Sequence, residues 1–276
     1  MKKVFIVASV LLLFLQTSYG QSLVTRNTFS IKVRDSIPIK IWLLKNYSNS
    51  KQYPVVYEFV YDHTNYIAAT ASNIWDIPEI IVVFAQIKPG NDYSSPNLSQ
   101  IGQEYYAFVK EELLPYISKE YSVNNFRIAA GLSQGADYVN YILRNDPSLF
   151  KSYLIFSTEY PIDYKPNFSL YTAKIKDSLS YYIAVANDTK ERIDFANQLF
   201  DSLKTSPYLN IKKQSFATSA HSYSILYALP EAMLFVFEGY NRIRPRLFNE
   251  SLLSYYKATK KNTAISIITA LFLKHY

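Results

Sequence analysis

The chain has 276 residues, of which 49% are hydrophobic and 18% are charged, with no cysteine and a formal net charge of +7. This composition excludes a disordered chain, a collagen-like fibre and a disulfide scaffold, and the length suits one large α/β domain or two small ones. Without cysteine there is no thiolate nucleophile, and three histidines (His63, His221 and His275) disfavour a multi-histidine metal site. We therefore expect no metal or organic cofactor.

The first twenty residues have the pattern of a cleaved secretory signal peptide. Lys2 and Lys3 precede an apolar run over residues 4–15, and small residues follow at 18–20, where signal peptidase cuts. The run is too short to span a bilayer comfortably, and an uncleaved membrane anchor is the alternative. We expect an exported protein, periplasmic or secreted, whose mature chain begins at Gln21. Export without disulfides is typical of a bacterial envelope.

Eight runs along the chain predict strands. The first two alternate apolar and polar residues, as half-exposed antiparallel edge strands do, whereas the middle ones are continuous apolar runs typical of parallel strands covered on both faces. The expected strands are 23–33, 37–45, 54–60, 79–85, 126–130, 152–158, 180–186 and 210–217.

Helical patterns lie between these strands, at residues 100–119, 134–145, 190–204 and 223–238. Strands that alternate with helices of this length require βαβ crossovers. The sequence therefore predicts an α/β fold with a mainly parallel central sheet of about eight strands and helices on both faces. No linker divides the body, so we expect a single domain over residues 21–240.

The positive charge is concentrated at the end of the chain. Residues 242–276 hold seven Lys or Arg and one acidic residue, which leaves residues 21–241 at about −1. A nearly neutral body argues against a nucleic-acid-binding domain. We interpret residues 241–276 as a solvated basic extension, with a short helix suggested by apolar residues at 265, 268 and 272. Weak contact of this tail with an anionic membrane surface is the alternative.

The sharpest motif is Gly131-Leu132-Ser133-Gln134-Gly135, a G-x-S-x-G between the expected strand 126–130 and helix 134–145. A nucleophile on such a sharp turn has a strained backbone, and side chains two residues away on either side would clash, so glycine occupies both positions. The turn lifts the Ser133 hydroxyl above the sheet and aims the backbone N–H of Gln134 at a developing oxyanion. A glycine turn without chemistry is the alternative.

A serine nucleophile needs a base and, in most triads, an acid. His221 follows the last expected strand and precedes helix 223–238, which is where such a base belongs. In the order Ser…Asp/Glu…His, the acid should follow strand 180–186, and Asp188 holds that position. Glu191 and Asp194 are its competitors, and Asp188 could instead simply cap the next helix.

The remaining candidates line the loops after two other strands. A second oxyanion donor should come from residues 61–65, where the backbone N–H of His63 or a neighbour such as Asp62 is available and the His63 imidazole could reach substrate. Lys88 follows strand 79–85, and open α/β sheets bind ligands beyond the carboxyl ends of their strands. An ordinary polar turn is the alternative for residues 61–65.

With these elements in place, the chain resembles the esterase branch of the α/β-hydrolases, which includes enterochelin, feruloyl and acetyl-xylan esterases, esterase D and formylglutathione hydrolase. The resemblance covers about residues 25–240 and implies an α/β-hydrolase fold, with Ser133 as nucleophile and His221 as base. The segments that carry it are PVVYEFVYD, IPEIIVVFAQ, EELLPYISKEYSV before FRIAAGLSQGA, NDPSLFKSYLIFS and HSYSILYALPEAMLFVF.

The chain departs from that family pattern at a few positions. Leu132 and Ala136 stand where His and Gly are common, Asp62-His63 stands where Asp-Gly is common, and Lys88 replaces a frequent arginine. Some relatives function with a Ser–His pair alone.

We expect a serine carboxylic-ester hydrolase that acts through an acyl-enzyme on an acylated carbohydrate or a siderophore-type ester. An acyltransferase with the same Ser–His pair and a non-catalytic envelope binding protein are the alternatives, and the departures at Leu132, Ala136 and His63 favour the latter.

Overall fold

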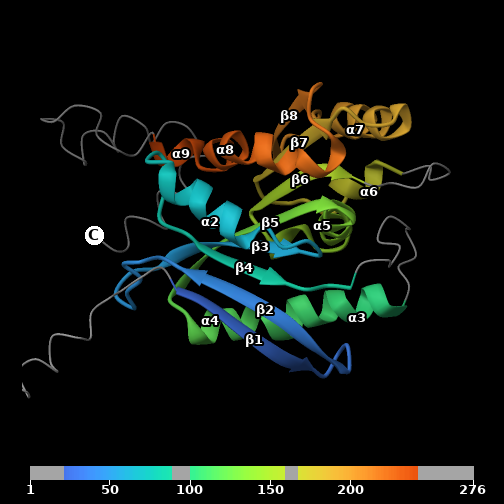
Figure 1. Ribbon diagram of the computed structural model, residues 1–276. Coiled ribbons are helices and arrows are strands. Elements are labelled where there is room, and N and C mark those ends of the chain that lie inside the picture. Colours follow the sequence, from blue (N-terminus) through green and yellow to red (C-terminus); the bar gives the residue numbers. More distant parts are fainter. Residues whose placement is uncertain (1–21, 89–99, 159–166, 242–276) are drawn as a thin grey trace, which may run out of the picture.

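All eight predicted strands form one sheet in the computed structural model, which describes residues 22–88, 100–158 and 167–241 (Figure 1). The strand order is β1-β2-β4-β3-β5-β6-β7-β8. The strands are β1 (Ser22–Ser30), β2 (Asp35–Leu43), β3 (Tyr53–Phe59), β4 (Ile81–Ala85), β5 (Val123–Ser133), β6 (Ser152–Thr158), β7 (Leu179–Ala186) and β8 (Leu209–Phe216).

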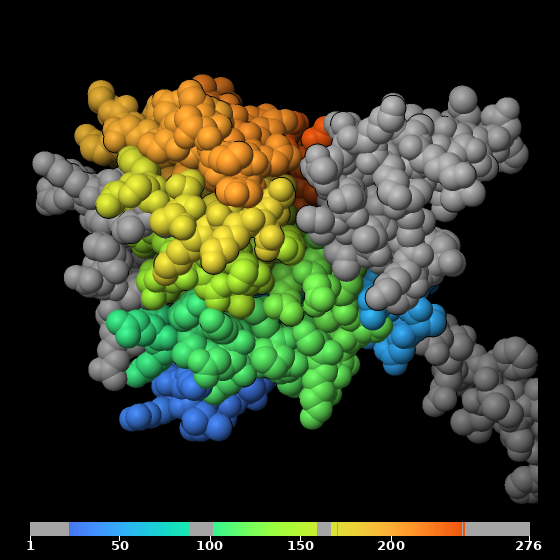
Figure 2. All heavy atoms as spheres, turned by 180° about the vertical axis from the view of Figure 1, so that it is seen from behind, coloured from blue at the N-terminus to red at the C-terminus, as the bar shows by residue number. Residues whose placement is uncertain are grey.

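The strand directions agree with the sequence pattern. β1 and β2 pair antiparallel, β2 lies antiparallel to β4, and every pair from β4 through β8 is parallel. Figure 2 shows the surface from behind, where the colours change from blue, near the N-terminal end of the described chain, at the bottom, through green and yellow, to orange at the top. The carboxyl ends of six parallel strands therefore meet at one edge, which is where α/β sheets bind ligands.

Helices cover both faces of the sheet and bury two apolar clusters. One face carries α5 (Gln134–Asn145), α6 (Ser169–Thr172), α7 (Lys190–Leu203) and the helical segment over residues 100–120. The other face carries α2 (Thr64–Asn73) and α8 (Ser224–Val236), which is followed by α9 (Glu238–Asn241). The sheet interior is nearly all apolar, so the buried polar groups among the described residues stand out.

Helix α2 was not among the helices expected from the sequence. Its start is fixed by Asp62, whose Oδ1 accepts the backbone N–H of Thr64 at 3.1 Å and the Thr64 hydroxyl at 2.7 Å. Its buried face consists of Thr64, Ile67, Ala68 and Ala71. With few large apolar side chains, this helix has a weak sequence signal, and packing against the sheet and α8 stabilises it.

The expected helix 100–119 is present but contains a wide turn. It consists of α3 (Gln100–Phe108), a π-helical turn η1 (Val109–Leu113) and α4 (Leu114–Glu120). Pro115 follows the wide turn and has no N–H to donate to the carbonyl of Glu111, and its ring crowds that carbonyl. The backbone relieves this conflict by widening the turn that precedes the proline.

The predicted signal peptide (residues 1–20) and the basic extension from residue 242 onward lie outside the described residues. Among the helices that the structure describes, none is long and apolar enough to cross a membrane.

Candidate active site

Ser133 is the last residue of β5 and immediately precedes α5. Its backbone has φ 56° and ψ −123°, a conformation that a non-glycine residue adopts only under strain, and 6% of its surface is exposed. Such strain is typical of functional turns because the surrounding structure must hold it in place. The strand–turn–helix arrangement expected for a nucleophile is therefore present.

The two glycines of the motif are required by close backbone approach. A Cβ on Gly131 would lie 2.2 Å from the carbonyl carbon of Gly135, which closes the turn on itself. A Cβ on Gly135 would lie 2.5 Å from the carbonyl oxygen of Phe59 at the end of β3. Gly135 thus brings the turn of Ser133 against the loop that follows β3.

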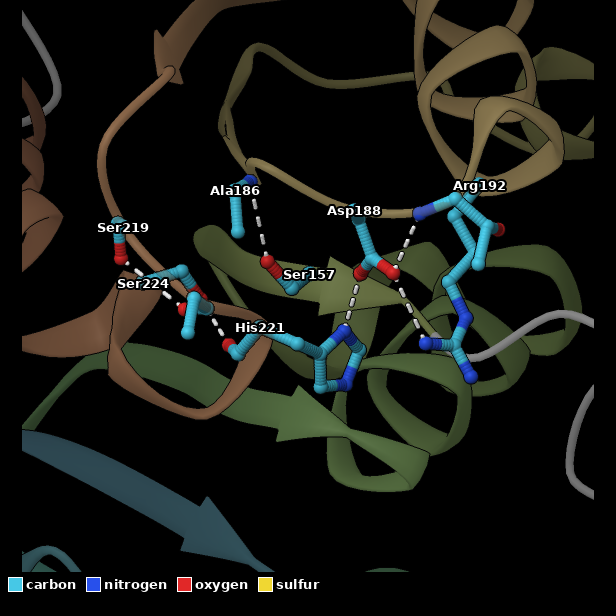
Figure 3. Close-up of polar contacts among 9 residues, drawn as sticks. Ser157, Ala186, Asp188, Arg192, Ser219, His221 and Ser224 are labelled. Carbon is cyan, nitrogen blue, oxygen red and sulfur yellow. Dashed lines mark hydrogen bonds and ion pairs between the residues drawn. The ribbon is translucent and has the colours of Figure 1, made fainter.

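His221 and Asp188 form a hydrogen-bonded pair above the ends of β7 and β8 (Figure 3). His221 begins a short 3-10 helix, η3 (His221–Tyr223), and its Nδ1 is bonded to Oδ2 of Asp188. The two loops are joined directly, because the backbone N–H of Asn187 donates to the carbonyl of Ser219 at 2.8 Å. The acid and the histidine singled out in the sequence are thus in contact.

Asp188 is ionised by its surroundings despite burial. Its side chain is 7% exposed, and Oδ1 accepts the backbone N–H of Thr189 at 2.8 Å and Nη1 of Arg192 at 3.0 Å (Figure 3). Burial alone would raise the pKa of Asp188, but the hydrogen bonds from His221, Thr189 and Arg192 outweigh it and hold that pKa below its ordinary value. An ionised carboxylate only accepts, so it selects the Nδ1–H tautomer of His221 and leaves Nε2 as the basic nitrogen.

The competing acids lie elsewhere. Asp194 forms an ion pair with Lys190, and Glu191 is exposed on the first turn of α7; neither has a hydrogen bond to His221 among the described residues. Asp188 does not cap α7: the N-cap residue of that helix is Thr189, no side chain caps the helix there, and Asp188 accepts only the N–H of Thr189, which precedes the helix.

The elements that carry Ser133 and His221 are in contact. η3 contacts β5, the strand that ends in Ser133. Nε2 of His221 is buried and has no hydrogen-bond partner in the described part of the chain, so no bond joins it to the Ser133 hydroxyl here. Such bonds are often long before substrate binds and tighten in the reacting complex.

The loop after β3 differs from the prediction. The backbone N–H of His63, the expected second oxyanion donor, donates instead to Oε2 of Glu58 at 2.7 Å. The N–H of Tyr61 is also engaged, by the carbonyl of Phe59 at 3.0 Å, across a tight turn in which Val60 has φ 75°. The imidazole of His63 is bonded as well, with Nδ1 lying 2.6 Å from Oε1 of Glu58.

Glu58 is the functional candidate that sequence reasoning missed. It is fully buried in β3, beside Phe84 on β4 and Ala130 on β5. Burial raises the pKa of Glu58 to about 7, although its hydrogen bonds with His63 oppose this rise. Burial lowers the pKa of His63, but the bond to Glu58 and its charge outweigh burial, so that pKa is raised overall. A single acid inside the apolar run PVVYEFV was the available signal.

Two further candidates have other partners. Asp62 accepts the backbone N–H of Thr64, the first residue of α2, and forms an ion pair with Lys40 on β2. The ammonium of Lys88 is paired with Asp35 at the start of β2, which β4 and β3 separate from β5. The structure therefore does not bring Lys88 to Ser133, and the rest of the predicted rim, residues 89–93, lies outside the described residues. Within those residues, no three His, Asp or Glu side chains gather as metal ligands.

The comparisons with known proteins concern the family and the fold. The model of the family named Esterase, described as Putative esterase, matches residues 30–163, which include Ser133 but neither Asp188 nor His221. No curated protein matches the sequence.

Several solved structures are similar. An IroE-like serine hydrolase from Shewanella oneidensis is 18% identical with a TM-score of 0.72, covering 87% of each chain. A feruloyl esterase module from Clostridium thermocellum, in complex with sinapinate, is 13% identical with a TM-score of 0.64, covering 80% of this chain and 89% of that one. A ferulic acid esterase from Anaeromyces mucronatus, in complex with ferulic acid, is 15% identical with a TM-score of 0.62, covering 80% and 91%. At these identities the likeness shows the α/β-hydrolase fold.

Proposed function

We propose that this chain, whose residues 30–163 match the Esterase family model, is a serine carboxylic-ester hydrolase acting through an acyl-enzyme on Ser133. The observation that carries the proposal is the bond between His221 and Asp188, formed beside the strand that ends in the strained Ser133. A hydroxyl, a carboxylate and an imidazole are the groups that a serine triad uses for acyl transfer. Here they follow one another in the chain order Ser…Asp…His, which is typical of α/β-hydrolases.

Each group has a defined role in the proposed reaction. Nε2 of His221 takes the proton from the Ser133 hydroxyl as its oxygen attacks the ester carbonyl, and Asp188 stabilises the imidazolium that forms. The backbone N–H of Gln134, at the N-terminus of α5, donates to the oxyanion. His221 then protonates the leaving alcohol. Water, activated by the same histidine, finally hydrolyses the acyl-enzyme.

The substrate we propose is an acylated carbohydrate or a siderophore-type ester. The feruloyl esterase structures similar to this chain hold sinapinate and ferulic acid, which are aromatic acyl groups. Near His221, Tyr223 is 56% exposed and Tyr227 is 57% exposed, so aromatic surface is available for a planar acyl group. We also propose export, on the signal pattern of residues 1–20.

Covalent labelling tests this proposal. The purified protein is treated with a fluorophosphonate and examined by mass spectrometry, beside Ser133→Ala and His221→Ala. We expect rapid labelling on Ser133 that is abolished in the first variant and strongly slowed in the second. A folded, monodisperse protein that does not label would contradict the esterase and the acyltransferase alike, and product analysis with added alcohols then separates those two.

A non-catalytic binding protein of the cell envelope is the second candidate. It is favoured by the loop after β3, where the backbone N–H of His63 is engaged by Glu58. Retention of a carbohydrate ligand by an unlabelled protein would support it.

A further inference from the structure

We propose that the imidazole of His63, held in place by Glu58, donates its Nε2–H to the oxyanion formed at Ser133, in place of the backbone N–H of the same residue. This inference rests on the proposed esterase function and names a further residue for it. Glu58 does not touch substrate in this scheme and is a positioning residue.

Three backbone donors of this loop, including the expected oxyanion donor, are used internally. The N–H of Tyr61 donates to the carbonyl of Phe59, that of His63 to Glu58 and that of Thr64 to Asp62. These bonds fix the turn and begin helix α2. Unless the turn is rebuilt, His63 can therefore serve the oxyanion only through its side chain.

The Nε2 atom of His63 remains available as a hydrogen-bond donor. Nδ1 and the backbone N–H both bind the same carboxylate, so the ring is held at two points. Nε2 has no hydrogen-bond partner among the described residues, and the side chain is 21% exposed. Glu58 therefore fixes the orientation of the ring and leaves Nε2 to interact with another group, as in carboxylate-bound histidines of catalytic sites.

The end of β3, which leads into the loop that carries His63, lies beside the turn of Ser133. Glu58 pairs across the sheet with Ala130, three residues before Ser133, and neighbouring strands lie about 4.8 Å apart. The carbonyl of Phe59 lies against Gly135, two residues beyond Ser133. His63 precedes α2 and His221 precedes α8, and these two helices pack together on one face of the sheet. Both histidines therefore stand at the end of β5.

The protonation of the pair makes Nε2 a donor at neutral pH. If the shared proton lies on Nδ1, the ring is an imidazolium; if it lies on Glu58, the neutral ring carries its proton on Nε2. Nε2–H is present in both forms and is lost only when the pair releases its proton. The other charged groups at His63 are Asp62 and its partner Lys40; burial lowers the pKa of His63, and the hydrogen bond and charge of Glu58, then the charge of Asp62, raise it overall.

Two substitutions separate this role from a structural one. In His63→Asn the amide occupies the place of Nδ1, so Glu58 keeps a partner but the Nε2 donor is gone. In His63→Gln the amide reaches the place of Nε2, so the donor stays but the bond to Glu58 is lost. We expect His63→Asn to lower kcat for p-nitrophenyl acetate by about 10²-fold with little change in KM. We expect His63→Gln to stay within about tenfold of the parent protein.

The pH profile gives a second readout. The parent protein should lose kcat at alkaline pH as the pair deprotonates, and His63→Gln should lack this alkaline limb because an amide does not titrate. Circular dichroism melts confirm that both variants are folded. Equal kcat in His63→Asn and the parent, or an unchanged alkaline limb in His63→Gln, would overturn this inference alone. A parent protein without Ser133-dependent turnover would overturn it together with the proposed function.

Discussion

Two histidines at the carboxyl edge of the sheet each bind a carboxylate through Nδ1: His221 binds Asp188, and His63 binds Glu58. In both pairs the second carboxylate oxygen accepts a backbone N–H, from Thr189 in one and from His63 itself in the other. The two arrangements are therefore alike in geometry and could be mistaken for equivalents.

They differ in charge. Asp188 has a guanidinium, Arg192, as a third donor, and despite the opposing effect of burial its pKa is lowered. Glu58 is completely buried and has no cationic partner besides His63 among the described contacts, and burial raises its pKa to about 7. In the proposed reaction the first carboxylate stays ionised and its histidine acts as a base, whereas the second shares a proton with its histidine, which acts as a donor. The complete burial of Glu58 and the additional cation beside Asp188 both contribute to this contrast.

The largest expected effect comes from removing the charge of the first pair. In Asp188→Asn the amide can donate to Nδ1 and hold the wrong tautomer of His221, so we expect kcat to fall by about 10³- to 10⁴-fold. Steady-state hydrolysis of p-nitrophenyl acetate measures it. Asp194→Asn, at a nearby acid in α7 that is paired with Lys190, is the matched control and should keep full activity. An undiminished kcat in Asp188→Asn would mean that the Ser–His pair acts without its acid.

The contact between the turn of Ser133 and the end of β3 can also be broken. In Gly135→Ala the new Cβ would lie 2.5 Å from the carbonyl oxygen of Phe59, so the loop carrying His63 must move away from Ser133. We expect a loss of about 3 kcal/mol or more in the free energy of unfolding, measured by urea denaturation, because backbone cannot yield as a side chain can. The control is Ala136→Gly, which adds no atom. A stable and active Gly135→Ala protein would show that the two regions do not need this contact.

The buried pair predicts a pH-dependent stability. Glu58 and His63 both have raised pKa values in the folded state, so the stabilisation they give is complete at low pH and is lost as pH rises from about 4.5, through the value of about 7 for Glu58, and beyond. We expect the free energy of unfolding to fall by up to about 3 kcal/mol over this range. Glu58→Gln should flatten the curve, and identical curves for the two proteins would contradict the assignment.

The sequence predicted best those features that depend mainly on residues near one another in the chain. The turn at Ser133 depends on two glycines and on the strand and helix that adjoin them, all within residues 123–145. The eight strands follow from apolar runs whose hydrophobic pattern also indicates their direction. Asp188 could be singled out because a triad acid follows a particular strand, although its contact with His221 spans 33 positions.

The loop after β3 shows why the pairing of His63 with Glu58 was not predicted. Its course depends on Val60, a β-branched residue at φ 75°, which no propensity scale anticipates. It also depends on Glu58, a charged residue inside an otherwise apolar strand, which sequence patterns treat as an interruption of the strand. Tertiary packing imposes both features, so the engaged N–H of His63 could be found only in the structure.

The smallest expected effect comes from a substitution that makes the His221–Asp188 pair resemble the His63–Glu58 pair. Arg192→Met removes the guanidinium from Asp188 and keeps most of the aliphatic length of the side chain. The pKa of Asp188 should rise, because burial would then be opposed only by His221 and Thr189, and its proton would be shared with His221 at a higher pH than before. We expect kcat to fall by about tenfold near neutral pH and the acid limb of the pH–rate profile to move upward. Arg192→Lys keeps a cation and should recover part of the loss. If Arg192→Met leaves the acid limb in place, the guanidinium does not decide the charge of this pair, and the contrast with Glu58 must arise from burial alone.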